Sequence, residues 1–333
     1  MRTLSVAFGS AVLVAATVAA QPGPPSTPPS SATVGFMHAI HATERLETTL
    51  GFYTDVFGLS AEIRPFANPG VAILTDSPGA ALRVAMLPLE DLNLELTEFS
   101  NVPRTAAEPS VVDPGAPRMK IFVRDLAPVL TALDARNTPI VTRSHAPVHM
   151  PSESGAARGI VFRDPDGYLV EAVETPNGAA GAGNVSGAVV GLTVADIDES
   201  LRFWRDRLGF AFGAPTSFTS DPARLDLYGL KGNMAFRTVT GVIPGSDVRM
   251  ELIEFRNVPR DSFDRRVPDP GSSGLAIRVA DIAALLDELK GSGTRVISKD
   301  QKLVEWSATL RNVFVKDPNG FNVELVGQTA PAR

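Results

Sequence analysis

The clearest hydrophobic pattern in the first half of the chain lies between His38 and Leu59. A strand and a turn are followed by apolar residues three or four positions apart, the spacing of one helical face. These positions are Leu46, Leu50, Tyr53 and Phe57. Gly58 comes directly after them, where a left-handed residue commonly ends a helix. The pattern therefore predicts a strand, a turn and an amphipathic helix that stops at Gly58.

A second copy of this pattern occupies residues 189–210. Its apolar face consists of Ile197, Leu201, Trp204 and Leu208, and Gly209 follows as the stop. The two predicted helices align through an adjacent pair of aromatic residues in each. The preceding strands differ, because the first copy has His38 where the second has Val189.

The repeat extends through both halves of the chain. Residues 92–104 (LNLELTEFSNVPR) match 248–260 (VRMELIEFRNVPR), and both continue to an Asp-Pro-Gly turn. Two further pairs of segments match, namely 119–137 with 275–293 and 160–174 with 313–327. Within each half, the order strand, helix and several strands occurs twice. We therefore predict an α+β fold of four βαβββ modules.

These repeats define two predicted domains, residues 33–176 and 188–328. The small-residue segment 177–187 has little to bury and is predicted to be a linker. A length of 333 residues agrees with two domains of about 150 residues each. The loop 100–117 is long for a compact domain, so we expect it to cover a cleft or to pass between modules.

The first residues have the features of a secretory signal. Arg2 precedes an apolar run that ends in small residues at 18–20, a suitable cleavage site before Gln21. Residues 21–32 are rich in proline and serine and are predicted to form a tether. We therefore expect residues 1–20 to be a signal peptide, and the mature protein to be periplasmic or secreted without a stable membrane anchor.

Composition argues against several classes of function. A formal net charge of −6 and a pI of about 5.4 favour neither nucleic acid nor an anionic membrane surface as a partner. The absence of cysteine excludes thiol chemistry and disulfides. We expect a monomer or homodimer whose ligand is a small molecule.

The strand with His38, the helix ending in GFYTDVFGL, the segment LELTEF and the closing DPDGYLVEAVE together resemble the vicinal oxygen chelate superfamily. This superfamily includes glyoxalase I, methylmalonyl-CoA epimerase, extradiol dioxygenases and bleomycin resistance proteins. The resemblance covers nearly all of residues 33–327 and implies a glyoxalase-like fold, in which paired modules form two cup-shaped mixed sheets. It also implies that the first and last strands of each module hold one divalent metal, which stabilises an enolate or activates oxygen.

The resemblance assigns a first-strand and a last-strand position to each module. In chain order these pairs are His38 and Glu95, Arg118 and Glu171, Val189 and Glu251, and Gly274 and Glu324. If each half closes on itself, one cup holds His38, Glu95, Arg118 and Glu171. If the first module pairs with the fourth, that cup holds His38, Glu95, Gly274 and Glu324. In either case the other cup contains no imidazole, and we expect it to be structural or to extend the substrate site.

Individual residues leave alternatives open. The glutamates lie among apolar neighbours. If their carboxylates are buried, they need a metal or another cation as a partner. If their strand edge is solvated, they are ordinary surface charges. Arg118 either binds a substrate carboxylate or phosphate, or pairs with Glu171 and removes it from the metal. His41 points to the strand face opposite His38 unless a bulge intervenes. The DPDG and DPNG segments lack the spacing of a calcium loop and are predicted to be turns.

The resemblance favours an exported, metal-dependent lyase or isomerase that acts on a small oxygen-rich substrate. Its expected metal ligands are His38, Glu95, Glu324 and Glu171, with Glu171 or Glu324 as the catalytic base. Its expected substrate contacts are Arg118, His145 and His149, the last two on a proline-interrupted loop that is otherwise solvated. This donor set suits Zn, Mn, Ni or Fe(II). The alternatives are a metal-free protein that sequesters a small molecule and an extradiol dioxygenase.

Overall fold

The computed structural model describes residues 33–152, 155–175 and 183–328. The predicted signal peptide and tether, and most of the predicted linker, lie outside these residues. Among the described residues, no helix is both long enough and apolar enough to cross a membrane.

The described residues form the four predicted modules. The first comprises β1 (Thr33–Ala42), α1 (Leu46–Phe57), β2 (Arg64–Phe66), α2 (Gly70–Leu74), β3 (Ala81–Leu89) and β4 (Leu92–Ser100). The second comprises β5 (Pro117–Val123), α3 (Ala127–Ala135), β6 (Val148–Ser152), β7 (Gly155–Arg163) and β8 (Leu169–Glu174). The third comprises β9 (Val185–Val194), α4 (Ile197–Leu201), the π-helical turn η1 (Arg202–Arg207), β10 (Ala211–Phe212), α5 (Pro222–Leu227), β11 (Ala235–Val242) and β12 (Arg249–Arg256). The fourth comprises β13 (Ser273–Val279), α6 (Ile282–Gly291), the 3₁₀ turn η2 (Lys299–Gln301), β14 (Val304–Glu305), β15 (Leu310–Lys316) and β16 (Asn322–Gln328).

The modules pair first with fourth and second with third. Sheet A has the strand order β14-β15-β16-β13-β1-β4-β3-β2, and sheet B has the order β10-β11-β12-β9-β5-β8-β7-β6. Antiparallel pairing of β1 with β13 joins the two modules of sheet A, and β5 with β9 joins those of sheet B. The predicted α+β fold with two mixed sheets is confirmed. Of the two pairings that the sequence left open, the structure has the one in which each sheet takes a module from each half.

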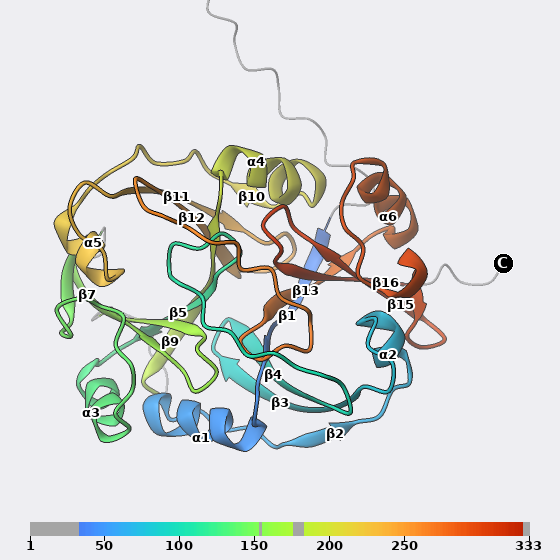
Figure 1. The fold of residues 1–333 in the computed structure, drawn as a ribbon, viewed down its shortest axis with the longest axis horizontal. Helices are drawn as coiled ribbons and strands as arrows, with labels where there is room; N and C mark the ends of the chain where they lie inside the picture. The colour runs from blue at the N-terminus through green and yellow to red at the C-terminus, as the bar shows by residue number, and fades with distance from the viewer. Residues whose placement is uncertain (1–32, 153–154, 176–182, 329–333) are drawn as a thin grey trace, which may run out of the picture.

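Long connections between the sheets make this pairing possible. The chain between β4 and β5 leaves sheet A and enters sheet B, and the chain between β12 and β13 returns (Figure 1). The two connections contact each other, since the Phe263 amide donates to the Pro114 carbonyl at 2.8 Å. The prediction that the loop 100–117 passes between modules is confirmed.

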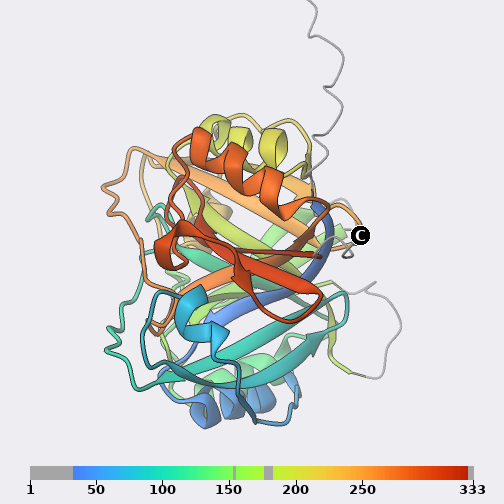
Figure 2. The same cartoon turned by 90° about the vertical axis from the view of Figure 1, so that its right-hand side faces the viewer.

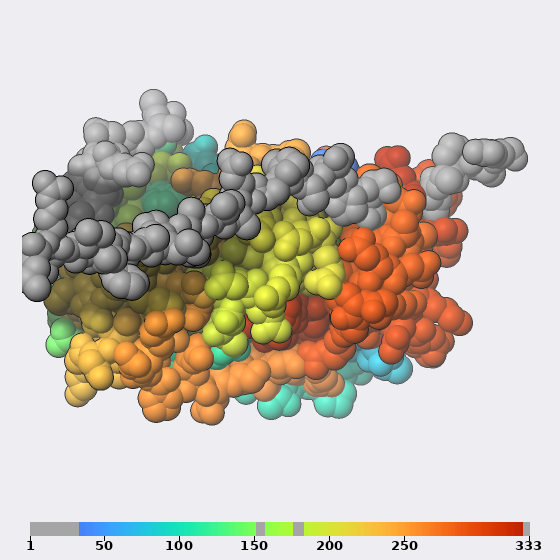
Figure 3. Space-filling model, turned by 90° about the horizontal axis from the view of Figure 1, so that it is seen from above, coloured from blue at the N-terminus to red at the C-terminus, as the bar shows by residue number. Residues whose placement is uncertain are grey.

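The helices that follow the first strand of each module lie on two opposite sides of the molecule. Helices α1 and α3 pack together on one side, and α4 and α6 lie on the other (Figures 1 and 2). Seen from above, the α4 region lies directly beside the α6 region (Figure 3). The Leu46 amide at the start of α1 donates to Glu98 Oε2 at 2.7 Å, and Gly58 ends the helix with a φ of 71°. The helix predicted from the apolar spacing is therefore confirmed.

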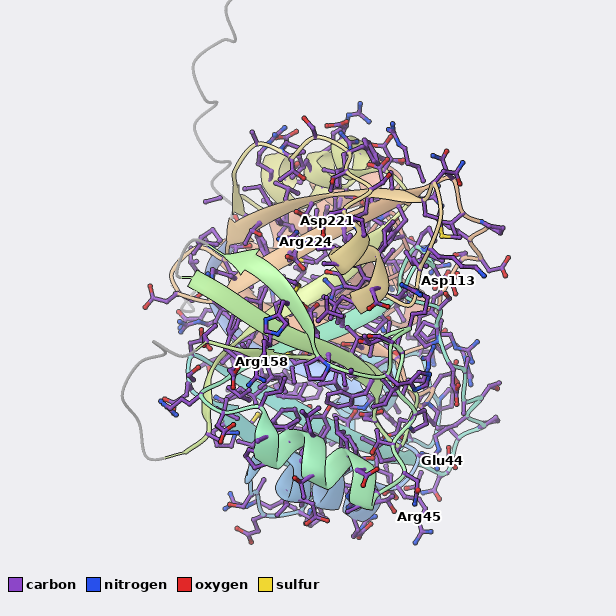
Figure 4. All side chains as sticks on the ribbon, turned by 90° about the vertical axis from the view of Figure 1, so that its left-hand side faces the viewer. Glu44, Arg45, Asp113, Arg158, Asp221 and Arg224 are labelled. Atoms are coloured by element: carbon purple, nitrogen blue, oxygen red, sulfur yellow. The ribbon has the colours of Figure 1, made fainter. Side chains whose placement is uncertain are left out.

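The two short helices cover the opposite, hollow faces of the sheets. Helix α2 contacts β3, β14 and β15 of sheet A, and α5 contacts β6 and β7 of sheet B. Asp221 and Arg224 mark the start of α5 above sheet B in Figure 4. Each hollow face and its helix enclose a separate apolar cluster, so the molecule has two cups of related construction.

Candidate functional site

Three of the predicted metal ligands meet in the cup of sheet A. His38 comes from β1, Glu95 from β4 and Glu324 from β16, and all three line a cavity of about 230 Å³. Nε2 of His38 lies 3.6 Å from Oε2 of Glu95. A bulge in β1 between Phe36 and His38 accompanies this placement. The two ligands predicted from the first module, His38 and Glu95, therefore share a cavity with Glu324 of the fourth module.

Burial disfavours the ionised form of both carboxyl groups in this site. Burial raises the pKa of Glu95 to about 7, and burial likewise raises the pKa of Glu324 to about 7. Burial lowers the pKa of His38, which the charge of Glu324 partly opposes. Asn312 Nδ2 donates to Glu324 Oε1 at 2.6 Å and orients that carboxyl group. The site therefore presents a neutral imidazole and two carboxyl groups that a nearby cation would stabilise.

The rest of the cavity wall is largely apolar. It includes Ile40, Leu74, Phe99, Phe314 and Val326. Phe66 from β2 and Trp306 from the loop after β14 also line it, and their rings stack with centroids 5.8 Å apart. Such a wall with a few polar groups at one end is typical of a small-molecule site.

The cup of sheet B has glutamates at the corresponding positions, Glu171 and Glu251, but basic side chains lie between them. Arg118 Nε lies 2.9 Å from Glu171 Oε2, and Lys120 Nζ lies 2.9 Å from Glu251 Oε1. The ring of Tyr228, which follows α5, lies over the Arg118 guanidinium at 5.2 Å. Burial alone would raise the pKa of Glu251, but Lys120 and Arg118 lower it to about 2. Of the two alternatives for Arg118, the structure has the ion pair with Glu171 and not a free substrate contact. Glu171 belongs to sheet B and His38 to sheet A, so the expectation that Glu171 is a metal ligand together with His38 is wrong.

The internal repeat shows what distinguishes the two cups. Matching the segments places Gly274 at the position of Arg118 and Ala276 at that of Lys120. The same comparison of the helix segments 68–79 and 221–232 places Thr75 at the position of Tyr228. Strand pairing agrees, because Ala276 lies opposite His38 and Lys120 lies opposite Val189. Small residues leave the cup of sheet A open and its carboxyl groups without an internal cation.

A second buried cluster lies outside both cups. His41 Nε2 contacts Asp164 Oδ2 at 2.8 Å and lies 3.6 Å from Asp166 Oδ2. Ligand atoms of these three residues lie within 4.8 Å of one another, the one such group of histidine and carboxylate residues among the described residues, so the cluster is a second candidate metal site. Its oxygens already accept hydrogen bonds, Asp166 Oδ2 from Thr49 and Asp164 Oδ2 from Tyr53. Burial alone would lower the pKa of His41, but the two aspartates raise it to about 10.

Sequence reasoning missed this cluster because it treated the DPDG segment as a turn only. The segment is a turn, but Asp164 and Asp166 also point into the contact between the sheets. His41 does face away from the cavity that His38 lines, as the strand alternation predicted. The signal available in the sequence was the second charge of DPDG, which the matching DPNG segment lacks.

The remaining predicted substrate contacts lie elsewhere. His145 and His149 are exposed, and His149 belongs to β6 at the edge of sheet B. Neither residue lines the cavity of sheet A. Figure 4 shows this face of the molecule, where the labelled Arg158 marks β7 beside β6. The structure therefore brings together His38, Glu95 and Glu324, and separates them from Arg118, Glu171, His145 and His149.

Comparison with known proteins agrees with the fold. The sequence profile of the Glyoxalase/Bleomycin resistance protein/Dioxygenase superfamily matches residues 35–172 and 188–325. Glyoxalase I from Zea mays is similar in structure, with a TM-score of 0.58, 18% identity, and coverage of 88% of this chain and 92% of that chain. A putative dioxygenase from Bacillus subtilis has a TM-score of 0.52 and 15% identity, covering 90% of this chain and 87% of its own. No curated protein sequence matches the chain.

Proposed function

Since the chain belongs to the glyoxalase, bleomycin resistance protein and dioxygenase superfamily, we propose that it is a metal-dependent lyase or isomerase with its centre at His38, Glu95 and Glu324. This proposal rests on the difference in charged residues between the two cups. Glu251 has Arg118 and Lys120 beside it, whereas no lysine or arginine lines the described cavity of sheet A. Burying two carboxylates without a cation is costly, and a divalent metal would remove that cost.

The types of side chain in this cavity suit such a metal. One imidazole nitrogen and two carboxylates form a donor set that Zn, Mn, Ni and Fe(II) all accept. When bound there, the metal would polarise neighbouring oxygens of a small substrate and stabilise negative charge on them. The lowered pKa of His38 keeps its imidazole neutral, as a ligand must be.

Glu324 is the residue to which we assign proton transfer. Without a metal, burial raises its pKa to about 7. A bound metal would favour the carboxylate form, which is the form that accepts a proton. Asn312, which also lines the cavity, donates a hydrogen bond to this carboxyl group, and His38 interacts with it electrostatically. Abstraction of a proton next to a polarised carbonyl is the reaction class that this arrangement supports.

Metal content of the purified protein tests the proposal. We expect one metal per chain in the unaltered protein and loss of that metal in His38→Ala and Glu95→Ala. His149→Ala is the matched control, because it removes an exposed histidine of the other sheet. His41→Leu tests whether bound metal instead occupies the cluster with Asp164 and Asp166. Metal retained by His38→Ala but lost from His41→Leu would overturn the assignment.

A metal-free protein that binds a small molecule is the second candidate function. The apolar wall of the cavity favours it, because such a wall binds ligands without any metal. It becomes the preferred function if the unaltered protein binds no metal after incubation with Mn, Fe, Ni and Zn in turn.

We also propose that the protein is exported. The proposal rests on the apolar run after Arg2 and the small residues before Gln21. Mass spectrometry of protein produced with its native N-terminus is expected to find a mature chain that begins at Gln21. An intact N-terminus in the cytosolic fraction would contradict export.

A further inference from the structure

We infer that the cavity of sheet A selects uncharged molecules whose non-reacting part is flat and apolar, with Phe66 and Trp306 as the residues that determine this specificity. The inference rests on the proposed function, since it names the substrate class of that same site. It goes beyond the metal centre because it concerns the part of the ligand that His38, Glu95 and Glu324 do not touch.

Phe66 and Trp306 form an aromatic pair at the rim of the cavity. Their rings are inclined by 21°, and both line the cavity. Phe66 is contributed by the edge strand of the first module and Trp306 by the fourth, so the pair exists only because these modules share a sheet. Aromatic faces favour flat partners beyond the gain from apolar burial.

The pair is held in place by contacts around the start of α2. Asn68 Nδ2 donates to the Trp306 carbonyl at 3.3 Å, and Asn68 Oδ1 accepts from the Gly70 amide at 2.8 Å. A Cβ added at Gly70 would lie 3.1 Å from the Trp306 ring, so the indole packs directly on the helix start. A preformed aromatic rim of this kind loses little conformational freedom when a ligand binds.

The charges at the inner end of the cavity disfavour a second anion. Glu95 and Glu324 would together balance the two charges of the proposed divalent metal, which would leave no net positive charge for a further carboxylate or phosphate. No lysine or arginine lines the described wall. A ligand anion buried against this wall would therefore remain unpaired, at considerable cost.

A neighbouring hollow does contain basic residues, but they are already engaged. Arg265 donates to the Thr105 carbonyl and lies 3.7 Å from Asp269. Arg266 donates to Asp269 and to the Pro103 carbonyl. Arg295 and Lys316 both pair with Asp264. These side chains line the hollow beside Thr75 and Val267, not the aromatic rim. These basic side chains therefore have partners already and are not part of the wall of the sheet A cavity.

Calorimetric titration with two matched probes tests the inference. The probes are 4-methylcatechol and 3,4-dihydroxybenzoate, which share a pair of neighbouring hydroxyl groups and differ in a methyl group against a carboxylate. We expect the uncharged probe to bind at least about tenfold more tightly, because the carboxylate must be desolvated without a partner. Equal or tighter binding of the benzoate would overturn the inference.

Variants of the aromatic pair show where the probe binds. We expect Phe66→Ala and Trp306→Ala each to weaken 4-methylcatechol binding by about tenfold or more while metal content stays unchanged. Phe218→Ala, a substitution outside the cavity wall, is the control and should leave the affinity unchanged. Unchanged affinity in both rim variants would contradict the assignment of specificity to this pair.

Fluorescence provides an independent reading of the same site. The chain has two tryptophans, Trp204 and Trp306. Trp204 is fully buried and its indole donates to Asp317, a place that Tyr53 takes in the first module. In Trp204→Tyr the remaining signal reports on Trp306, and we expect 4-methylcatechol to quench it.

Repeating both measurements in metal-free protein separates this inference from the proposed function. A preference for the uncharged probe without metal supports the inference even if no metal ever binds, because the aromatic rim and the apolar wall do not depend on the metal. Metal binding without any such preference supports the proposed function and overturns the inference.

Discussion

Nε2 of His41 and Oδ2 of Asp164 lie 2.8 Å apart, and this contact joins β1 of sheet A to the β7–β8 turn of sheet B. Both side chains are fully buried. In the repeat, Leu192 takes the position of His41, and Asn319 replaces the second aspartate. Asp317 accepts from Trp204 at 3.3 Å, as Asp164 accepts from Tyr53. The extra negative charge of Asp166 therefore occurs together with the histidine that neutralises it.

Removing His41 should show how far the buried aspartates depend on its positive charge. His41→Leu, which introduces the residue found at position 192 of the repeat, leaves two aspartates buried without a counter-charge. We expect it to lower the free energy of unfolding by about 3–5 kcal/mol. Adding Asp166→Asn, as at position 319, should recover a large part of the loss. Urea unfolding of both variants measures this, and a double variant no more stable than His41→Leu would contradict it.

Stability should also depend on pH through His41. Its pKa in the folded protein is about 10, above the ordinary value of 6.5. The protonated imidazole therefore contributes its full stabilisation below pH 6.5 and loses it as the pH rises toward 10. Unfolding free energies measured across this interval should fall with increasing pH in the unaltered protein. The fall should be smaller in His41→Leu/Asp166→Asn, and equal slopes would show that other groups cause it.

Glu324 should destabilise the metal-free protein above neutral pH. Its folded pKa of about 7 exceeds the ordinary 4.5, so the stability present below pH 4.5 is lost as the pH rises toward 7. Glu324→Gln should therefore raise the unfolding free energy at about pH 8 in the presence of a chelator, by about 1–3 kcal/mol. Glu305→Gln, at an exposed carboxylate, should have little effect. A loss of stability in Glu324→Gln would contradict the proposed burial cost.

The cup of sheet B should contribute to stability and not to metal binding. Arg118→Met leaves Glu171 and Glu251 with Lys120 alone, and we expect a loss of about 3–5 kcal/mol. Arg158→Met removes a partly exposed ion pair with Glu174 on the same sheet and should cost about 1 kcal/mol. Metal content should be unchanged in both variants. Loss of metal in Arg118→Met would indicate that the metal centre lies in sheet B and would contradict its assignment to sheet A.

Thr75→Tyr should close the cavity of sheet A as Tyr228 helps to close that of sheet B. We expect at least about tenfold weaker binding of 4-methylcatechol, with about 1–3 kcal/mol of lost stability from overpacking. Metal content should persist, because Thr75 lies in the wall and supplies no ligand. Thr75→Ser preserves the hydroxyl group and is the control. Unaltered probe affinity in Thr75→Tyr would show that the probe binds elsewhere.

The amino-acid sequence determined the local elements and their repetition. The spacing from Leu46 to Phe57 and the stop at Gly58 predicted α1, because a helical face and its end depend on nearby residues alone. Alternation along β1 separated His38 from His41 for the same reason, since successive strand residues point to opposite faces. The matching segments also identified the four modules and every glutamate of the two cups.

Only the tertiary structure decided which of these residues meet. Both pairings of the modules are compatible with the same strands, because an edge strand can pair with either partner once the connections are long enough. The choice of β13 as the partner of β1 places Glu324 in the same cavity as His38, and the matching choice of β9 as the partner of β5 places Glu251 beside Arg118. It also unites Phe66 with Trp306, and His41 with Asp164, pairs whose members are far apart in sequence. Such contacts depend on packing between distant segments, which local patterns do not encode.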